Sequence, residues 1–270
     1  MSVDALPCRV CGRPSRHLFD GPILQHRVAY FECADCGYVQ TETPHWLEQA
    51  YVDVINRSDT GLLRRNARNT SVVLRMLMLV GQLRGRLIDC AGGYGVLVRM
   101  LRDRGVNAFW HDPQCQNLLA RGFEAGADDK ADFVTAFEAM EHFTQPQAEL
   151  AALLARADNV LVSTDLIASP APAPQAWWYY GPEHGQHIGF FRRRTLEYLA
   201  QQLGCHLHSD GRQFHLFTRR HIAPWRFAWA RKTHRIALLW ARARLRSKVW
   251  SDLALAREQA LELPPAGNHP

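Results

Sequence analysis

The chain has 270 residues, of which 47% are hydrophobic and 21% charged, and its formal net charge is +6. This composition is ordinary for a globular protein, and no apolar run approaches the roughly 20 residues that span a membrane. The start, MSVDALPC, lacks a charged stretch followed by an apolar one, so we expect no signal peptide and a cytoplasmic protein. Seven cysteines, four of them in two C-x-x-C pairs, favour a reducing compartment and a metal site over a disulfide framework.

Residues 1–40 contain the two cysteine pairs, CRVC and CADC, and each pair is followed by a glycine. A spacing of two residues lets both thiolates of a pair face one ion, and the glycine permits the tight turn that this requires. Two pairs complete a closed tetrahedral site, which is structural, and a segment this short is not stable by burial alone. The sequence therefore predicts a small zinc-ribbon-like module that binds zinc through four residues: Cys8, Cys11, Cys33 and Cys36.

Residues 41–85 are expected to form a helical connector, with the main helix near 69–83 and a stop at Gly85. From residue 86 to 220, short apolar runs such as RLIDC, DFVTAF and NVLVSTDLI alternate with helical patterns. This alternation predicts an α/β domain with a doubly wound, mostly parallel sheet of seven strands, the last of them antiparallel. The final runs, CHLHSD and FHLFTRR, meet at Asp210-Gly211 with no helix between them, which predicts an antiparallel hairpin.

The segment RLIDCAGGYGVLVRML places an apolar strand, an acid near its end, a glycine cluster and a helix in direct succession. Glycines at such a turn let the backbone approach a ligand in front of the helix N-terminus. The next strand ends at Asp112, 23 residues after Asp89, where a carboxylate suits the hydroxyls of a ribose. A dinucleotide-binding fold uses the same elements, so the turn alone leaves the cofactor open.

The turn resembles that of the class I S-adenosylmethionine-dependent methyltransferases, in which an acid is followed by glycines at alternate positions. Gly93 and Gly95 match the second and third glycines, Ala91 stands at the first, and Gly92 is extra. DFVTAFEAMEHF, at 132–143, is similar to the fourth strand of that family. The resemblance implies S-adenosylmethionine as the cofactor, bound by Asp89, Gly92, Gly93, Gly95 and Asp112 and, at its methionine end, by Ala136, Phe137 and Glu138.

The stretch WWYYGPEHGQHIGFF, at 177–191, follows a strand and a stiff spacer, SPAPAPQ. Because ligands bind outside the carboxyl ends of the strands in such sheets, we expect this stretch to form a lid over the cofactor. Aromatic faces can stack on sugars or cover a sulfonium, and a histidine can remove an acceptor proton. The candidate catalytic residues are His184 and His187, with Glu183 to orient them or raise a pKa; the candidate substrate-binding residues are Trp178, Tyr179, Tyr180, Glu141 and His142.

Simpler interpretations exist for the same residues. The aromatic residues at 177–180 would also form a packing ridge, and Glu141 would also suit the start of a helix, where a carboxylate is stabilised by the helix dipole.

The layout of the whole chain is similar to that of bacterial sugar C-methyltransferases from carbohydrate gene clusters. Those enzymes carry a zinc-binding amino domain and a Glu-His pair followed by an aromatic residue, and Glu183-His184 occupies the place of that pair. The resemblance implies methyl transfer to a nucleotide-linked or lipid-linked sugar, at carbon or oxygen. It also implies His184 as the base, whereas His187 and His142 are the other candidates from the residues themselves.

Two other functions are compatible with these motifs: an RNA base methyltransferase with a zinc module, and a non-catalytic scaffold of the same fold. TAFEAM lacks the Asn/Asp-Pro-Pro-aromatic turn typical of methylation at exocyclic amines, and few basic residues lie among the cysteine pairs. We therefore do not expect a nucleic acid partner.

Residues 221–270 are expected to form a basic, amphipathic, helical tail. Between Arg219 and Trp250 lie ten basic and no acidic residues, interleaved with tryptophan and leucine. Such a tail could pack on the core or on a second subunit, which is the main expectation. The alternatives are contact with the headgroups of an anionic membrane at its inner face, and contact with RNA phosphates.

Overall fold

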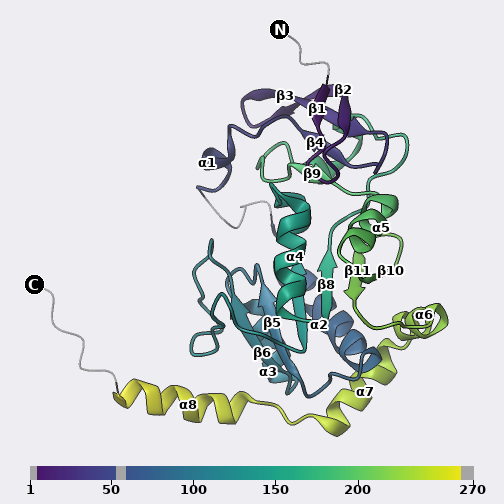
Figure 1. Ribbon diagram of the computed structural model, residues 1–270. Helices are drawn as coiled ribbons and strands as arrows, with labels where there is room; N and C mark the ends of the chain where they lie inside the picture. Colours follow the sequence, from purple (N-terminus) through teal and green to yellow (C-terminus); the bar gives the residue numbers. More distant parts are fainter. Residues whose placement is uncertain (1–4, 53–58, 263–270) are drawn as a thin grey trace, which may run out of the picture.

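The computed structural model describes residues 5–52 and 59–262, and its strands form two sheets, one above the other in Figure 1. The upper sheet has five antiparallel strands in the order β1-β2-β3-β4-β9. Four of these strands belong to the amino-terminal segment, whereas β9 comes from the aromatic stretch far along the chain. Their bounds are Ala5–Pro7 (β1), Pro14–Ile23 (β2), His26–Cys33 (β3), Val39–Thr41 (β4) and Gly189–Phe190 (β9).

The lower sheet is the predicted α/β sheet, with the strand order β10-β11-β8-β7-β5-β6. Strands β5 to β8 run parallel, and β11 runs antiparallel to β8, so the reversed last strand is confirmed. The predicted hairpin is also confirmed, because β10 pairs antiparallel with β11. In its turn, Asp210 Oδ1 accepts the N–H groups of Arg212 and Gln213. The bounds are Arg86–Cys90 (β5), Asn107–His111 (β6), Phe133–Phe137 (β7), Asn159–Ser163 (β8), His206–Ser209 (β10) and Phe214–Thr218 (β11).

The prediction of seven strands is wrong, because this sheet has six strands over the described ranges. The position beyond β6 holds a single parallel bridge, between Trp110 and Glu124. The segment there, GFEAGADDKAD, is rich in glycine and charge and lacks the alternating apolar residues of a half-buried strand. It therefore does not extend the sheet.

Helices cover both faces of the lower sheet. Leu87, Phe133 and Leu161 bury one face under α2, α3 and part of the tail, whereas Ile88 and Val134 bury the other face under α4 and α5. The helix α2 begins earlier than expected, because its first turns are rich in leucine and arginine, and it ends before Gly81 (φ +75°), not at Gly85. The bounds are Leu47–Ala50 (α1), Leu62–Leu79 (α2), Val96–Asp103 (α3), Pro146–Arg156 (α4) and Arg193–Gln202 (α5).

The aromatic stretch joins the two sheets. Tyr180 and Phe190 are buried in the core of the upper sheet, whereas Phe191, the next residue, is buried in the core below. Gly189 is required in β9 because an added Cβ would overlap the hydroxyl of Tyr38. The stretch is therefore not a free lid, because its last part, Gly189–Phe190, is a strand of the amino-terminal sheet.

The amino-terminal end of α5, with its N-cap residue Arg192, strengthens the same junction. Arg192 donates hydrogen bonds to Glu32 (2.5 Å) and to the carbonyl of Gly37 (3.0 Å), and Thr195 Oγ1 donates to the carbonyl of Cys36 (2.9 Å). The second cysteine turn is thus bonded to the helix that follows β9.

The tail forms three helices along the lower end of the molecule (Figure 1). The expectation that it packs on protein is confirmed in part, because Phe227, Ala230 and Ala241 are buried in the core cluster that contains α2. Asp252 is 4% exposed and pairs with Arg102 (2.7 Å) and Arg99 (2.8 Å) of α3. None of the described helices is both long and apolar enough to cross a membrane. The bounds are Pro224–Lys232 (α6), His234–Arg244 (α7) and Val249–Glu262 (α8).

Candidate active site

The turn between β5 and α3 has the close packing that the glycine cluster predicts. Gly95 caps α3 with φ at +83°, and an added Cβ would lie 2.9 Å from the Cβ of Ala120. An added Cβ at Gly92 would lie 2.7 Å from Cδ1 of Trp110. Ala91 adopts φ +60°, a left-handed conformation that glycine favours and that costs another residue about 1–2 kcal/mol. The turn therefore keeps a glycine-like conformation at Ala91, with strain.

The acids of the first two strands lie on either side of this turn. Asp112 accepts the N–H of Gly93 (2.9 Å) through Oδ2 and the N–H of Gln114 (2.9 Å) through Oδ1, so it ties together the ends of β5 and β6. Asp89 is 3% exposed and accepts a hydrogen bond from Thr135 Oγ1 (2.6 Å). Burial raises the pKa of Asp89 to about 7. Asp112 is the acid at the surface of the turn, and Asp89 supports the turn from within.

The carboxyl end of β7 supplies the predicted methionine end of the cofactor site. Ala136 is buried, and the ring of Phe137 meets that of Phe214 edge-on with centroids 5.9 Å apart. Glu138 adopts φ +49°, and its carboxylate accepts the Ser163 hydroxyl (2.5 Å). Strained non-glycine residues therefore follow both β5 and β7, as is common at functional sites.

A buried polar cluster follows β7. Glu141 and His142 lie in a short 3-10 turn, Met140–His142, and face His187 from the aromatic stretch. Glu141 is fully buried; its Oε1 accepts the hydroxyl of Tyr179 (2.7 Å) and lies 3.9 Å from His187 Nε2. His187 donates Nδ1–H to the carbonyl of Tyr179 (2.6 Å), so its Nε2 carries a lone pair.

Burial has the largest effect on the pKa of each of the three members of this cluster. Burial lowers the pKa of His142 to about 3 and holds the pKa of His187 well below its usual range. Burial, with a smaller contribution from the charge of Glu138, raises the pKa of Glu141 to about 8. The Tyr51 hydroxyl lies 2.8 Å from Nδ1 of His142. Tyr51 could not be predicted as part of the cluster, because it lies in the connector and meets His142 only through the fold.

The structure separates the predicted residues of the aromatic stretch. His184 is half-buried with its ring centroid 4.6 Å from that of His187, and its Nδ1 accepts the N–H of Gln186 (3.1 Å). Glu183 is exposed and raises the pKa of His184, but burial has the larger effect and the pKa is lowered. The described hydrogen bond that orients His184 thus comes from Gln186, not from Glu183.

The aromatic residues are mostly structural. Tyr180 is 1% exposed, donates its hydroxyl to the carbonyl of Pro172 (2.8 Å) and packs on Tyr30, so its predicted role in substrate binding is wrong. Tyr179 is also buried, and it holds Glu141 and His187 instead of facing an acceptor. Trp178, at 72% exposed, is the member of the predicted trio that remains accessible.

The four paired cysteines converge as the spacing predicts. Sγ of Cys8 lies 3.6 Å from that of Cys36, and Sγ of Cys11 lies 3.5 Å from that of Cys33, with all four within 4.8 Å of one another. Tetrahedral zinc–thiolate bonds of about 2.3 Å require sulfur separations of nearly this size. The glycines after the pairs have φ of +72° and +77°. This donor set fits one zinc ion.

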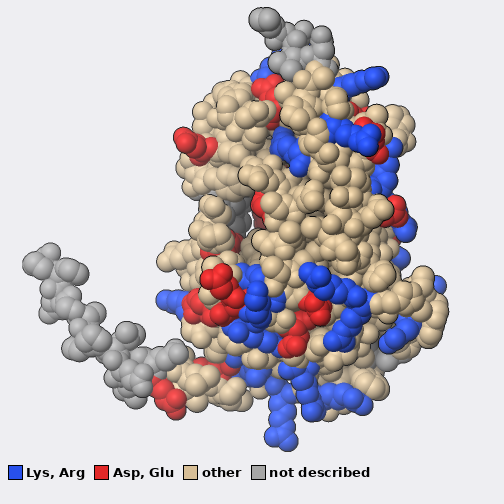
Figure 2. Space-filling model, in the orientation of Figure 1, with Lys and Arg blue, Asp and Glu red and all other residues tan. Residues whose placement is uncertain are grey.

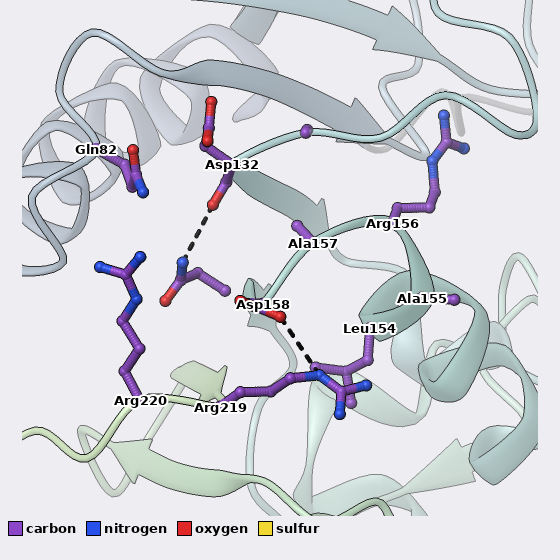
Figure 3. A pocket seen from close by; sticks show the side chains of 11 residues that line it. Gln82, Asp132, Leu154, Ala155, Arg156, Ala157, Asp158, Arg219 and Arg220 are labelled. Atoms are coloured by element: carbon purple, nitrogen blue, oxygen red, sulfur yellow. Dashed lines mark hydrogen bonds and ion pairs between the residues drawn. The ribbon is translucent and has the colours of Figure 1, made fainter.

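A hollow of about 480 Å³ lies at the amino ends of strands β7 and β8 of the lower sheet (Figure 3). Asp132 and Asn159, at the starts of β7 and β8, line it, and Arg219 pairs there with Asp158 (3.5 Å). Ligands of such sheets bind outside the carboxyl ends of the strands, so this hollow is not the active site.

A parallel sheet with a reversed last strand, a strained glycine turn after its first strand and an acid after its second define an S-adenosylmethionine-dependent methyltransferase. The sequence model of the methyltransferase domain family matches residues 62–210, more than half of the chain, and the chain belongs to this family. A search of curated proteins gives no match.

Solved structures with a similar fold are also methyltransferases. Magnesium protoporphyrin IX methyltransferase from Synechocystis PCC 6803, with bound SAH, is 16% identical, with 64% of this chain and 93% of that chain covered and a TM-score of 0.42. An O-methyltransferase family protein from Burkholderia thailandensis is 12% identical (66% and 64% covered, TM-score 0.48). Human N-acetylserotonin methyltransferase in complex with SAM is 15% identical (59% and 54%, TM-score 0.41). Such distant likeness says nothing about the acceptor.

Replacing Asp112 with alanine should weaken S-adenosylmethionine binding by about 1.5–3 kcal/mol, the value of a hydrogen bond to a charged group. The reason is its position at the end of β6, where it also holds the glycine turn through Gly93. Titration calorimetry measures the change, and Asp103→Ala, an exposed acid on α3, is the matched control. Equal affinities for the two variants would show that Asp112 does not bind the ribose.

Proposed function

We propose that the enzyme methylates a carbohydrate acceptor, a nucleotide-linked or lipid-linked sugar. The observation that supports this is the polar cluster of Glu141, His142 and His187, in which Glu141 and His187 are buried, together with the hydroxyl of Tyr51. A polyol has hydroxyl groups that match such a surface, whereas an apolar acceptor would leave these buried groups unpaired at a cost of several kcal/mol. The cluster follows β7, next to the predicted methionine end of the cofactor site.

Methyl transfer to a hydroxyl or to an acidic carbon requires the acceptor to lose one proton. The acceptor's electron pair forms the new bond to the methyl carbon, and the sulfur–methyl bond breaks with its pair left on sulfur. His187 is the histidine best placed to act on the acceptor, because its Nε2 keeps a lone pair. His184 is less suitable in this conformation, since its Nδ1 accepts a backbone N–H and its other nitrogen therefore carries the proton of the neutral ring.

The acceptor class is tested by incubating the enzyme with isotope-labelled S-adenosylmethionine and a panel of nucleotide-linked sugars, lipid-linked sugars and bulk RNA. We expect mass spectrometry to find label on a sugar, and no label with the Glu141→Gln variant. Label on RNA alone would show that the acceptor is RNA and would overturn the proposal of a nucleotide-linked or lipid-linked sugar.

We also propose that Cys8, Cys11, Cys33 and Cys36 hold one structural zinc ion. The sulfur separations and the two glycine turns support this, and so does the small size of the segment. Protein purified without chelator should contain at least one zinc per chain by metal analysis. A content well below one would rule the site out.

The tail suits attachment to an anionic membrane, which is the localisation that we propose. Trp225, Trp229 and Trp250 are 69%, 58% and 77% exposed although Phe227 and Ala230 of the same region are buried. Lys and Arg side chains gather at this lower end of the molecule (Figure 2). Exposed tryptophan next to basic residues is typical of proteins that lie on a membrane surface.

Replacing Trp225, Trp229 and Trp250 together with alanine should weaken binding to anionic vesicles at least tenfold, since each indole buries apolar area worth ~1 kcal/mol or more. Sedimentation with vesicles at physiological salt measures it. Point variants are preferable to truncation, because Asp252 and Phe227 pack on the core. Trp178→Ala, which removes an exposed tryptophan outside the tail, is the control. If the triple variant and the unaltered enzyme sediment equally with the vesicles, the tail is not a membrane anchor.

A further inference from the structure

We propose that Glu141, His142 and His187 bind a divalent transition-metal ion beside the methyl-transfer centre. The inference rests on the proposed function of the same site, because it states how that site activates a hydroxyl of the acceptor. Nothing in the fold of the lower sheet requires such an ion. Glu141 and His142 lie in the turn after β7, whereas His187 belongs to the aromatic stretch, and the fold brings the two segments together.

The geometry of the three side chains supports a common ligand. One carboxylate oxygen of Glu141 and one ring nitrogen from each of His142 and His187 lie within 4.8 Å of one another. Metal bonds of about 2.1 Å bring such atoms to about 3 Å from one another, so small rotations of the side chains suffice. The two imidazole centroids are 5.1 Å apart with the rings at 78°. The rings are thus close neighbours, and each contributes one nitrogen to this group of ligand atoms.

The hydrogen bonds around the cluster leave acceptor atoms without donors. Oε2 of Glu141 is buried and, over the described ranges, has no hydrogen-bond partner. His187 uses its ring proton on the carbonyl of Tyr179, so Nε2 also lacks a proton of its own. Buried lone pairs that converge without a donor are unfavourable, and a cation between them removes that cost.

The groups behind the ligands are those that metal-binding histidines usually have. A backbone carbonyl fixes the tautomer of His187, the hydroxyl of Tyr51 meets His142, and the hydroxyl of Tyr179 holds Oε1 of Glu141. Two imidazoles and one carboxylate favour Mn²⁺, Co²⁺, Ni²⁺ or Zn²⁺ over Mg²⁺, which prefers oxygen ligands. Three protein ligands also leave positions open for an acceptor.

In this site the ion binds the acceptor hydroxyl and lowers its pKa, as metal ions do for bound water. The O–H proton leaves to solvent, and the freed oxygen pair forms the bond to the methyl carbon as the carbon–sulfur pair returns to sulfur. With the ion bound, the lone pair of His187 Nε2 is used as a ligand, so His187 does not act as the base proposed for the metal-free site, and the reaction that the site supports best is oxygen methylation.

The test is a titration with Mn²⁺ of enzyme that contains one zinc ion per chain, held by the four cysteines, followed by electron paramagnetic resonance of the free Mn²⁺. Mn²⁺ is chosen because it competes poorly for thiolates, so the cysteine site stays occupied by zinc. We expect one Mn²⁺ per chain. Glu141→Gln and His187→Ala should each lower the affinity at least ~100-fold, which exceeds the usual effect of losing an outer hydrogen bond.

Matched variants separate a metal site from a loss of folding. His184→Ala, which changes a neighbouring ring outside the ligand set, should bind Mn²⁺ as the unaltered enzyme does. Tyr51→Phe, which removes only an outer hydrogen bond, should bind it with an intermediate affinity. S-adenosylmethionine binding measured by calorimetry should be unchanged in all four variants, which shows that they are folded.

Absence of Mn²⁺ binding up to millimolar concentration, or equal binding by Glu141→Gln, would overturn the site. Sugar methylation that continues at the same rate after the ion is removed would overturn its role while leaving the acceptor class intact. Specific Mn²⁺ binding without methylation of any sugar would support the site and count against the proposed function instead.

Discussion

Replacing Cys36 with serine is expected to unfold the amino-terminal module and abolish methyl transfer. Structural zinc contributes roughly 10–16 kcal/mol in small zinc domains, which is as large as the total stability of many proteins. The turn that contains Cys36 also accepts the hydroxyl of Thr195 through its carbonyl, and that bond joins the module to α5. Zinc content, melting temperature and turnover, measured on the same preparation, check the prediction.

Cys205→Ser is the matched control for this variant, because Cys205 is a partly buried thiol outside the four-cysteine group. It should keep the zinc and the activity, with a loss of stability of about 1 kcal/mol at most. Retention of both zinc and turnover by Cys36→Ser would mean that the four thiols do not form the proposed site.

His187→Ala is expected to lower turnover ~10²–10⁴-fold with little change in affinity for S-adenosylmethionine. The reason is that His187 Nε2 faces Glu141, whereas the cofactor turn lies at the end of β5. Steady-state rates with a saturating sugar acceptor, together with calorimetry for the cofactor, separate the two effects.

His184→Ala provides the comparison for this second variant. We expect a smaller loss, because the Nδ1 of His184 already accepts the backbone N–H of Gln186. If His184→Ala lost more turnover than His187→Ala, the base would be the residue that the Glu-His resemblance implies, and the preference for His187 would be wrong.

Features that depend on local chemistry could be predicted from the sequence. The cysteine spacing, the glycines that follow it, the strand–turn–helix around Gly95 and the hairpin at Asp210 each need only neighbouring residues to form. The structure agrees at all of these positions. Even the departure at Ala91 was visible in the sequence, although only the backbone shows that alanine adopts the conformation of the missing glycine.

Features that depend on partners far along the chain could not be predicted. The role of the aromatic stretch changed because β9 pairs with β4, and no local pattern in WYYGPEHGQHIGFF indicates a strand of the amino-terminal sheet. Tyr180 therefore looked like a substrate-binding residue and is a core residue. Tyr51 gave no signal for the same reason, since its contact with His142 exists only after the two sheets have met.

The pairing of β9 with β4 has a consequence for how acceptor preference can be exchanged between enzymes of this kind. A chimera made by swapping residues 1–60 alone would leave the sheet without a matching fifth strand, and it would misplace His187, which follows Tyr179 in the same buried stretch. A swap of residues 165–192 alone would give the sheet a β9 that does not match the β4 retained from the original chain. The two segments, although separated in the gene, therefore need to be exchanged together if a chimera is to keep its function.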